Sequence, residues 1–133
     1  MKILIAGGSG FIGRTLEALL RQENHEVYIL TRRTPKNDRQ IQWDGRTAQG
    51  WGQRMNDMDA VVNLTGYGLE HWPWTKRQKQ KFESSRVEPG RALVSAIESA
   101  SRRPKVFLQI SGINHYGLRG EDMADESTPP AEE

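Results

Sequence analysis

Three glycines at intervals of three, Gly7, Gly10 and Gly13, stand in the stretch GGSGFIG near the N-terminus. The apolar run KILIA precedes them, and a segment with the apolar spacing of a helix follows them. In this context the first glycine permits a sharp turn, the second lets the backbone approach a pyrophosphate, and the third lets helix and strand pack closely. The amides at the helix N-terminus would bind the phosphates. The pattern therefore favours a dinucleotide site over a strand-to-helix turn that has no ligand.

The end of the second apolar run indicates which dinucleotide would bind. NAD sites of this type usually carry Asp or Glu there, and its carboxylate binds the ribose 2′-hydroxyl. Here EVYILTRR ends in Thr31, Arg32 and Arg33. A carboxylate would repel a 2′-phosphate, whereas a guanidinium can bind it through two hydrogen bonds. We therefore expect NADP(H) to be preferred over NAD(H), with Arg32 as the stronger candidate; the alternative is that both arginines are ordinary loop surface.

A parallel sheet with flanking helices would position these residues. Pro89 lies inside the longer of the expected helices, residues 75–101, and predicts a kink, or two helices of which Pro89 opens the second. Strands that alternate with helices predict an α/β fold: a doubly wound parallel sheet of the Rossmann type with strand order 3-2-1-4-5. The expected strands are residues 2–6, 26–31, 41–43, 59–66 and 105–111, and the expected helices are 11–23, 75–101 and a short one near 52–57.

Composition and charge exclude several classes of protein. The chain has 133 residues, with 19 Lys and Arg against 17 Asp and Glu and no cysteine. This balance argues against nucleic acid or a membrane surface as partner, and the lack of cysteine rules out disulfides and thiolate metal sites. The histidines share no ligand spacing, so we expect no metal. No apolar run approaches the ~20 residues of a membrane span, so we expect a soluble, cytoplasmic protein.

Motifs along most of the chain resemble one family. The glycine spacing, NLTG at residues 63–66 and the later ISG and YG are similar to the extended short-chain dehydrogenase/reductases. HEVYILTRR, DAVVNLTG, SRVE and RPKVFLQIS resemble more closely an atypical branch, the NAD-dependent epimerase/dehydratase proteins. Members of this family are longer than this chain. The resemblance therefore implies that a region shaping the substrate pocket would follow residue 133.

The resemblance also implies contacts with three parts of the cofactor. It places Arg86, in SRV, on the long helix and pointing toward the cofactor, although a surface ion pair would equally explain this arginine. The residues carried over are Gly7, Ser9, Gly10, Phe11 and Ile12 for the phosphates, Thr31 and Arg32 for the adenosine ribose and its 2′-phosphate, and Leu64, Thr65 and Gly66 for the adenine and ribose side.

The catalytic residues match the family less completely. The superfamily polarises a carbonyl or hydroxyl with a Ser or Thr after the fifth strand. It exchanges the proton with a Tyr whose pKa is lowered by a Lys four residues on. Ser111, at the end of VFLQIS, is the candidate serine. The chain contains no Tyr-x-x-x-Lys, so Tyr116 is considered either as an alternative acid, as a substrate contact, or as a packing tyrosine on a loop.

Two functions from different classes fit these observations. The first is an NADP(H)-binding oxidoreductase or epimerase that acts at a hydroxyl- or carbonyl-bearing carbon of a small, sugar-nucleotide-like substrate. The second is a catalytically silent dinucleotide sensor or regulatory module. We expect a dinucleotide-binding domain over residues 1–118 and an acidic loop over 119–133 that leads toward a substrate region, so that these 133 residues lack a complete catalytic set. Analogy with the superfamily adds a homodimer through the long helices.

Overall fold

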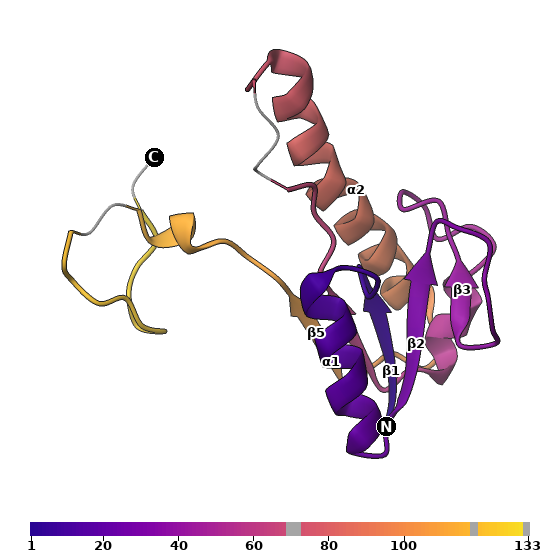
Figure 1. Ribbon diagram of the computed structural model, residues 1–133. Coiled ribbons are helices and arrows are strands. Elements are labelled where there is room, and N and C mark those ends of the chain that lie inside the picture. Colours follow the sequence, from indigo (N-terminus) through magenta and orange to yellow (C-terminus); the bar gives the residue numbers. More distant parts are fainter. Residues whose placement is uncertain (69–72, 118–119, 132–133) are drawn as a thin grey trace.

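The computed structural model describes residues 1–68, 73–117 and 120–131. Its centre is a sheet of five parallel strands in the order β3-β2-β1-β4-β5 (Figure 1), which confirms the predicted order. The chain moves outward from β1 to β3 and then returns to β4 on the other side of β1, so the strand order reverses between β1 and β4. The strands are β1 (Lys2–Ala6), β2 (Glu26–Thr31), β3 (Gln40–Gln42), β4 (Ala60–Asn63) and β5 (Val106–Gln109).

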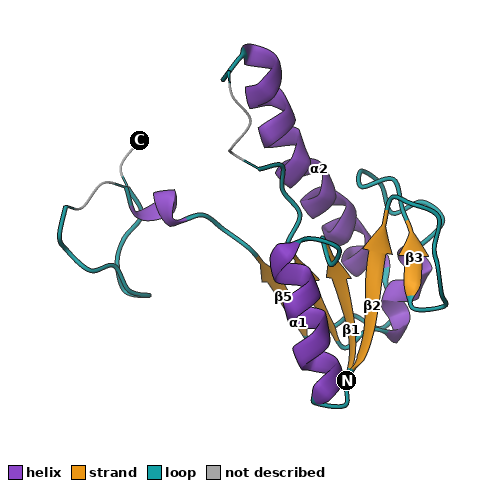
Figure 2. Ribbon diagram, in the orientation of Figure 1, coloured by secondary structure: helices purple, strands orange, loops and turns teal. Residues whose placement is uncertain are grey.

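Helices cover both faces of the sheet (Figure 2). α1 (Phe11–Gln22) lies on one face, and α2 (Lys76–Ser99) lies on the other together with the 3-10 helix η1 (Gly52–Asp57). Because successive side chains of a strand point to opposite faces, alternate residues of each strand enter different clusters. The α1 cluster contains Ile3, Ile5, Val27, Ile29, Ala60 and Val62 with Leu16 and Leu20 against them; the α2 cluster contains Leu4, Ala6, Leu30, Val61, Trp51, Met55, Ala92 and Leu93.

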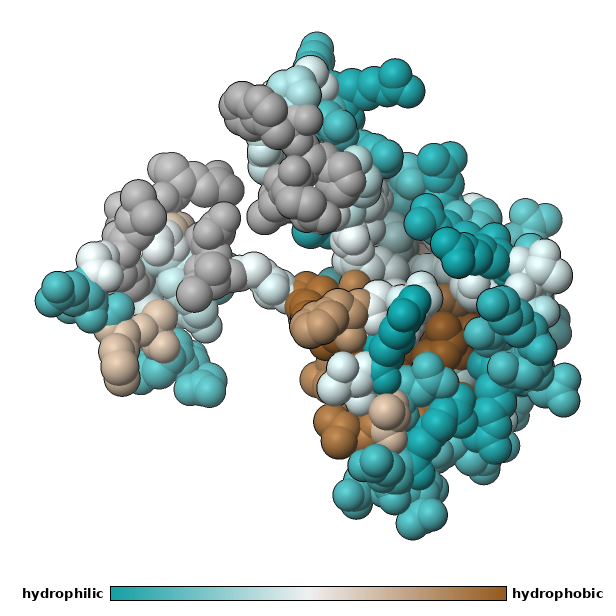
Figure 3. All heavy atoms as spheres, in the orientation of Figure 1, coloured by the Kyte–Doolittle hydropathy of each residue, from teal (hydrophilic) through white to brown (hydrophobic). Residues whose placement is uncertain are grey.

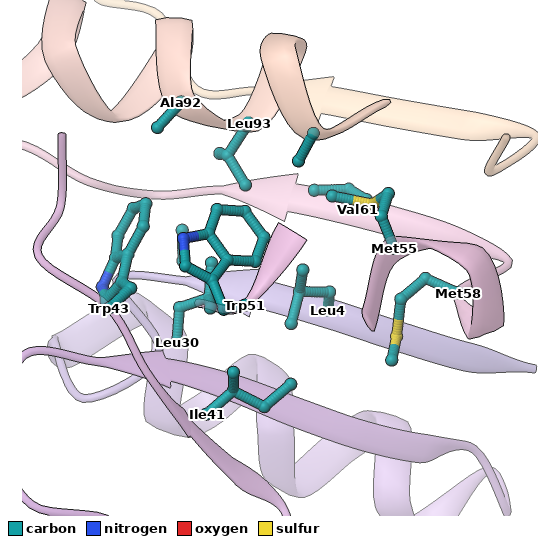
Figure 4. Packing of buried hydrophobic residues seen from close by; sticks show 12 residues of the cluster. Leu4, Leu30, Ile41, Trp43, Trp51, Met55, Met58, Val61, Ala92 and Leu93 are labelled. Carbon is teal, nitrogen blue, oxygen red and sulfur yellow. The ribbon is translucent and has the colours of Figure 1, made fainter. Parts of the chain in front are cut away.

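Two tryptophans organise the α2 cluster (Figure 4). The rings of Trp43 and Trp51 meet edge to face with centroids 5.7 Å apart. The buried indole of Trp51 donates its Nε1 hydrogen to the carbonyl oxygen of Thr47 at 2.8 Å, so its polar atom is satisfied. This packing fixes the segment between β3 and η1 against the sheet.

The predicted boundaries of β1 and β2 are confirmed, and those of later elements differ slightly. The strand predicted over 59–66 ends at Asn63, because the chain beyond it follows the carboxyl edge of the sheet. The strand predicted over 105–111 is observed only over Val106–Gln109, because the chain then leaves the sheet. α2 continues through Pro89, so the alternative of two helices is wrong. Burial of Ala92 and Leu93 on the sheet offsets the backbone hydrogen bond that proline cannot donate.

Strand β5 forms one edge of the sheet, and its side chains are exposed. Val106, Phe107 and Leu108 lie on it, and Leu108 keeps 57% of its surface accessible. Figure 3 shows apolar surface gathered on this side of the molecule, next to α1. Within the described part of the chain, β5 therefore lacks the cover that buries β1 and β4.

Beyond β5 the chain leaves the sheet, and its last segment lies apart from α1 and β1 (Figure 1). This segment contains the short 3-10 helix η2 (Ile113–Tyr116). The predicted boundary between residues 118 and 119 lies outside the described residues. No helix in the described ranges is both long and apolar enough to cross a membrane.

Candidate functional site

The glycine-rich turn connects β1 to α1 at the carboxyl edge of the sheet. Gly7 has a φ of +82°, which side-chain-bearing residues rarely adopt, and its carbonyl oxygen accepts the amide of Gly10 at 3.1 Å. A Cβ at Gly13 would lie 2.5 Å from both the Gly7 carbonyl oxygen and the Gly8 Cα. The sharp turn and the close helix packing predicted from the glycine spacing are both observed.

The N-terminus of α1 offers unpaired backbone donors. Gly10 is the N-cap, no side chain caps the helix, and no acidic residue lies in its first turn. Among the described residues, no hydrogen bond occupies the amides of residues 11–13. Phe11 is 92% exposed, so solvent or a ligand can reach this end of the helix. Free amides and a helix dipole with no competing carboxylate match the chemistry of a diphosphate.

A basic residue that the sequence analysis did not single out lies over this turn. The Nε of Arg14 donates to the carbonyl oxygen of Ser9 at 2.9 Å, which holds the guanidinium beside the turn. A cation in the first turn is unusual, because the helix dipole disfavours positive charge there. That anomaly was the signal in the sequence that could have identified Arg14.

The end of β2 places Arg32 beside the next loop. Thr31 ends the strand; its hydroxyl oxygen accepts the amide of Arg33 at 3.2 Å, and its carbonyl oxygen accepts the amide of Trp43 at 3.0 Å. Arg32 is exposed, and its Cδ lies 3.5 Å from where a Cβ on Gly45 would stand. The aliphatic part of Arg32 therefore runs along the turn that follows Trp43.

Asp44 builds that turn. One carboxylate oxygen accepts the amides of Arg46 and Thr47, both at 2.8 Å, and the other accepts the Thr47 hydroxyl at 2.8 Å. These hydrogen bonds, led by the Thr47 amide, hold the pKa of Asp44 below its usual value. No role was predicted for Asp44 from the sequence, although Asp before Gly is a common turn signal.

The loop after β4 completes the carboxyl edge. The amide of Leu64 donates to the Ala6 carbonyl at 2.9 Å, which keeps the loop beside β1. Asn63, fully buried, accepts the amide of Thr65 at 3.1 Å and its hydroxyl at 2.7 Å. Asn63 also donates to Oε1 of Gln109 at 2.7 Å. Leu64 and Thr65 thus lie next to the glycine-rich turn, and Gly66, which follows them, lies against Arg86.

Arg86 and Ser85 contact the same loop from α2. Nη1 of Arg86 donates to the carbonyl oxygens of Tyr67 and Phe82, both at 3.1 Å. The Ser85 hydroxyl oxygen accepts the amide of Tyr67 at 2.8 Å. The alternative of a surface ion pair for Arg86 has no support among the described residues, because its hydrogen bonds go to backbone carbonyls and a hydroxyl. Sequence reasoning missed Ser85, and no spacing in the sequence indicated its contact.

The two candidate catalytic residues lie after β5. The backbone ladder continues one residue past the strand, since the amide of Ile110 donates to the Asn63 carbonyl at 3.0 Å, and the exposed Ser111 follows directly. Tyr116 ends η2, where its ring meets that of His115 with centroids 5.3 Å apart. Ser111 thus lies close to the carboxyl edge of the sheet, whereas Tyr116 belongs to the segment that stands apart from the sheet (Figure 1).

A parallel sheet whose strand order reverses beside a glycine-rich turn defines a Rossmann-type α/β domain. Comparison with known proteins identifies the family of this domain. The chain belongs to the NAD dependent epimerase/dehydratase family, whose family model matches residues 3–133.

Individual relatives agree with this assignment. Epimerase family protein ML0860 of Mycobacterium leprae is 35% identical over 125 residues, covering 94% of this chain and 40% of that protein. Epimerase family protein YfhF of Bacillus subtilis is 31% identical over 139 residues, and the match covers 100% of this chain and 45% of that protein. A crystal structure of human epimerase family protein SDR39U1 with NADPH superimposes with a TM-score of 0.84 at 31% identity, covering 98% of this chain and 43% of that one. The chain therefore spans less than half the length of these relatives.

Proposed function

We propose that this chain binds NADP(H) on the carboxyl edge of its sheet, as the cofactor-binding part of an epimerase-like oxidoreductase. The observation that carries the proposal is the free N-terminus of α1 above a glycine-rich turn. The amides of residues 11–13 would bind the diphosphate, and Arg14 would add positive charge beside it. The NADPH bound to the human relative supports the same ligand class.

The preference for the 2′-phosphate rests on Arg32. The residue follows β2 directly, is exposed, and is supported along its stem by the Asp44 turn. A guanidinium can bind a phosphate through two parallel hydrogen bonds, and no carboxylate stands at the end of β2. Thr31, Leu64, Thr65 and Gly66 would border the adenosine part of the cofactor.

We further propose a reaction class for the whole protein. The bound cofactor would supply a hydride acceptor or donor for a carbon that bears a hydroxyl or carbonyl. Ser111, close to the end of β5, would donate a hydrogen bond to the reacting oxygen of a small, sugar-nucleotide-like substrate. A homodimer in the cytoplasm remains the expectation that the superfamily suggests.

A second candidate, the dinucleotide sensor, is favoured by one observation. Tyr116, the candidate proton donor, belongs to η2 on the segment that lies apart from α1 and β1 (Figure 1). A sensor needs the cofactor site alone, whereas an enzyme also needs a proton donor near Ser111. Both candidates share the same first step, which is binding of the dinucleotide.

The test is an equilibrium titration of the purified chain with NADPH and, separately, with NADH. We expect NADPH to bind at least about tenfold more tightly, because one charge-assisted pair contributes ~1.5–3 kcal/mol. Equal affinities would remove the role of Arg32 while leaving the dinucleotide site. Failure to bind either dinucleotide would overturn the proposal.

A further inference from the structure

The loop that borders the proposed dinucleotide site is held by α2 through the backbone of Tyr67. We propose that Ser85 and Arg86 are positioning residues for dinucleotide binding: they act through Tyr67 and the loop of residues 64–67 rather than by touching the ligand. This inference rests on the proposed function and adds to it. It assigns a role to Ser85, and it makes Arg86 a positioning residue instead of a direct contact of the cofactor.

Both backbone groups of Tyr67 are bound by neighbouring residues of one helix turn. Its amide donates to the Ser85 hydroxyl oxygen at 2.8 Å, and its carbonyl oxygen accepts Nη1 of Arg86 at 3.1 Å. The ammonium of Lys81 adds a third contact, 4.2 Å from the centre of the Tyr67 ring. α2 therefore satisfies Tyr67 much as a neighbouring strand would.

Arg86 is itself held in place. Its guanidinium stacks over the Phe82 ring, 3.6 Å from the ring centre, and Nη1 also donates to the Phe82 carbonyl. It lies against Gly66, where a Cβ would stand 3.1 Å from Cζ and from Nη2. The planar group therefore fits between an aromatic ring and a loop that has no side chain at that point.

The other end of the same loop rests on the glycine-rich turn. The amide of Leu64 donates a hydrogen bond to the carbonyl oxygen of Ala6, and a Cβ at Gly7 would stand 3.0 Å from the amide nitrogen of Thr65. Any displacement of the loop that follows loss of the Tyr67 contacts would therefore be passed to the turn that would bind the diphosphate. Because packed backbones transmit such shifts, loss of the α2 contacts should weaken binding at a distance.

The chain offers matched controls for both residues. Ser84 makes the same bond within the helix as Ser85, to the carbonyl three residues earlier, but no bond to the loop. Arg91 is an exposed arginine on the same helix, and its side chain makes no hydrogen bond or ion pair within the described ranges. Ser84→Ala and Arg91→Lys thus repeat the chemical changes of Ser85→Ala and Arg86→Lys away from the loop.

The experiment measures two quantities on the full chain and these four variants. The first is the amide hydrogen-exchange rate of Tyr67 by NMR without ligand, with the β1 amides as the internal reference. The second is the dissociation constant for NADPH. In Ser85→Ala and Arg86→Lys we expect Tyr67 exchange to rise at least about fivefold and NADPH binding to weaken by a similar factor, with no change in the controls.

Arg86→Lys separates positioning from direct contact. A lysine keeps the positive charge that a direct phosphate contact would need, but it lacks the planar group that stacks on Phe82. If Arg86→Lys binds NADPH like the parent chain, or if Ser85→Ala leaves Tyr67 exchange unchanged, the inference is overturned. If the parent chain binds no dinucleotide, the proposed function fails. The exchange rates of Tyr67 then still show whether Ser85 and Arg86 restrain the loop of residues 64–67.

Discussion

Gly7 and Leu64 are in backbone contact: a Cβ on Gly7 would lie 2.8 Å from both the carbonyl carbon and the carbonyl oxygen of Leu64. The glycine-rich turn after β1 therefore rests directly on the loop after β4. A side chain at Gly7 would push apart the two backbone segments that border the proposed site. The absence of a side chain there matters for packing as much as for the positive φ of the turn.

The Gly7→Ala variant should lose both stability and dinucleotide binding. Gly50 is the matched control, because its φ of +80° is nearly the same and nothing lies within 4 Å of its Cβ position. Gly50→Ala should cost only the backbone strain, about 1–2 kcal/mol of unfolding free energy. Gly7→Ala should cost at least about 1 kcal/mol more by urea denaturation. Equal costs would show that the contact with Leu64 carries no weight.

Gly13→Ala tests the packing of α1 against the turn. On helix propensity alone, alanine should stabilise the helix by about 1 kcal/mol relative to glycine. The Cβ would, however, lie 2.5 Å from backbone atoms of Gly7 and Gly8. We expect net destabilisation in thermal or urea unfolding. A more stable Gly13→Ala variant would contradict the close approach of helix and strand.

Arg32→Ala should reduce the affinity for NADPH by about 10- to 100-fold and leave that for NADH nearly unchanged. The reason is that the charge-assisted contact of this guanidinium would be with the 2′-phosphate, which NADH lacks. Arg33→Ala serves as the control, since Arg33 lies one residue further from the strand. Equal losses for both dinucleotides in Arg32→Ala would assign the arginine to general charge rather than to selection.

Asn63→Ala should be among the more destabilising single changes in this chain. Asn63 is fully buried and binds Thr65 and Gln109 through three hydrogen bonds, so truncation leaves buried partners unsatisfied. We expect a loss of about 2–4 kcal/mol in urea denaturation. Asn37→Ala, at an exposed site with one local hydrogen bond, should change stability by less than about 1 kcal/mol. Similar losses for the two variants would contradict this account of Asn63.

Asp59 should make stability depend on acid pH. Its carboxylate accepts the amide of Lys2 and the Arg102 guanidinium, which lower its pKa from the usual 3.8. The folded state thus binds this proton less readily than the unfolded state, so its stabilisation is present above about pH 4 and lost as the pH falls through the lowered pKa.

The thermal midpoint of the parent chain should accordingly fall more steeply from pH 6 to pH 3 than that of Asp59→Asn. Asp38→Asn controls for the change in net charge. A difference between the parent chain and Asp59→Asn that stays constant over this range would contradict the assigned role of Asp59.

Local patterns in the sequence predicted the sheet well. β1 and β2 are apolar runs followed by Gly7 and by the polar segment that begins at Arg32, and both signals depend on neighbouring residues only. The order of strands follows from alternating strands and helices together with a glycine-rich first turn. The continuity of α2 through Pro89 could not be predicted, because it depends on how strongly the following residues pack against the sheet.

The side-chain contacts of the site were predicted only in part. Gly7 and Gly13 act as their spacing indicated. The contacts of Ser85 and Arg86 with Tyr67 span 18 and 19 residues and depend on how α2 packs against the loop after β4. The support of Arg32 by Gly45 likewise depends on the turn that Asp44 closes. Such contacts are set by tertiary packing, and local patterns in the sequence do not determine it.

The most direct measurement is NMR of the ¹⁵N-labelled chain during titration with NADPH. We predict that the largest amide shifts occur at residues 7–13, at the start of α1, and next at Thr31 and Arg32. Amides of η1, on the opposite side of the sheet from α1, should not move. Saturating NADPH that shifts none of the amides of residues 7–13, or shifts only those elsewhere, would contradict the dinucleotide site.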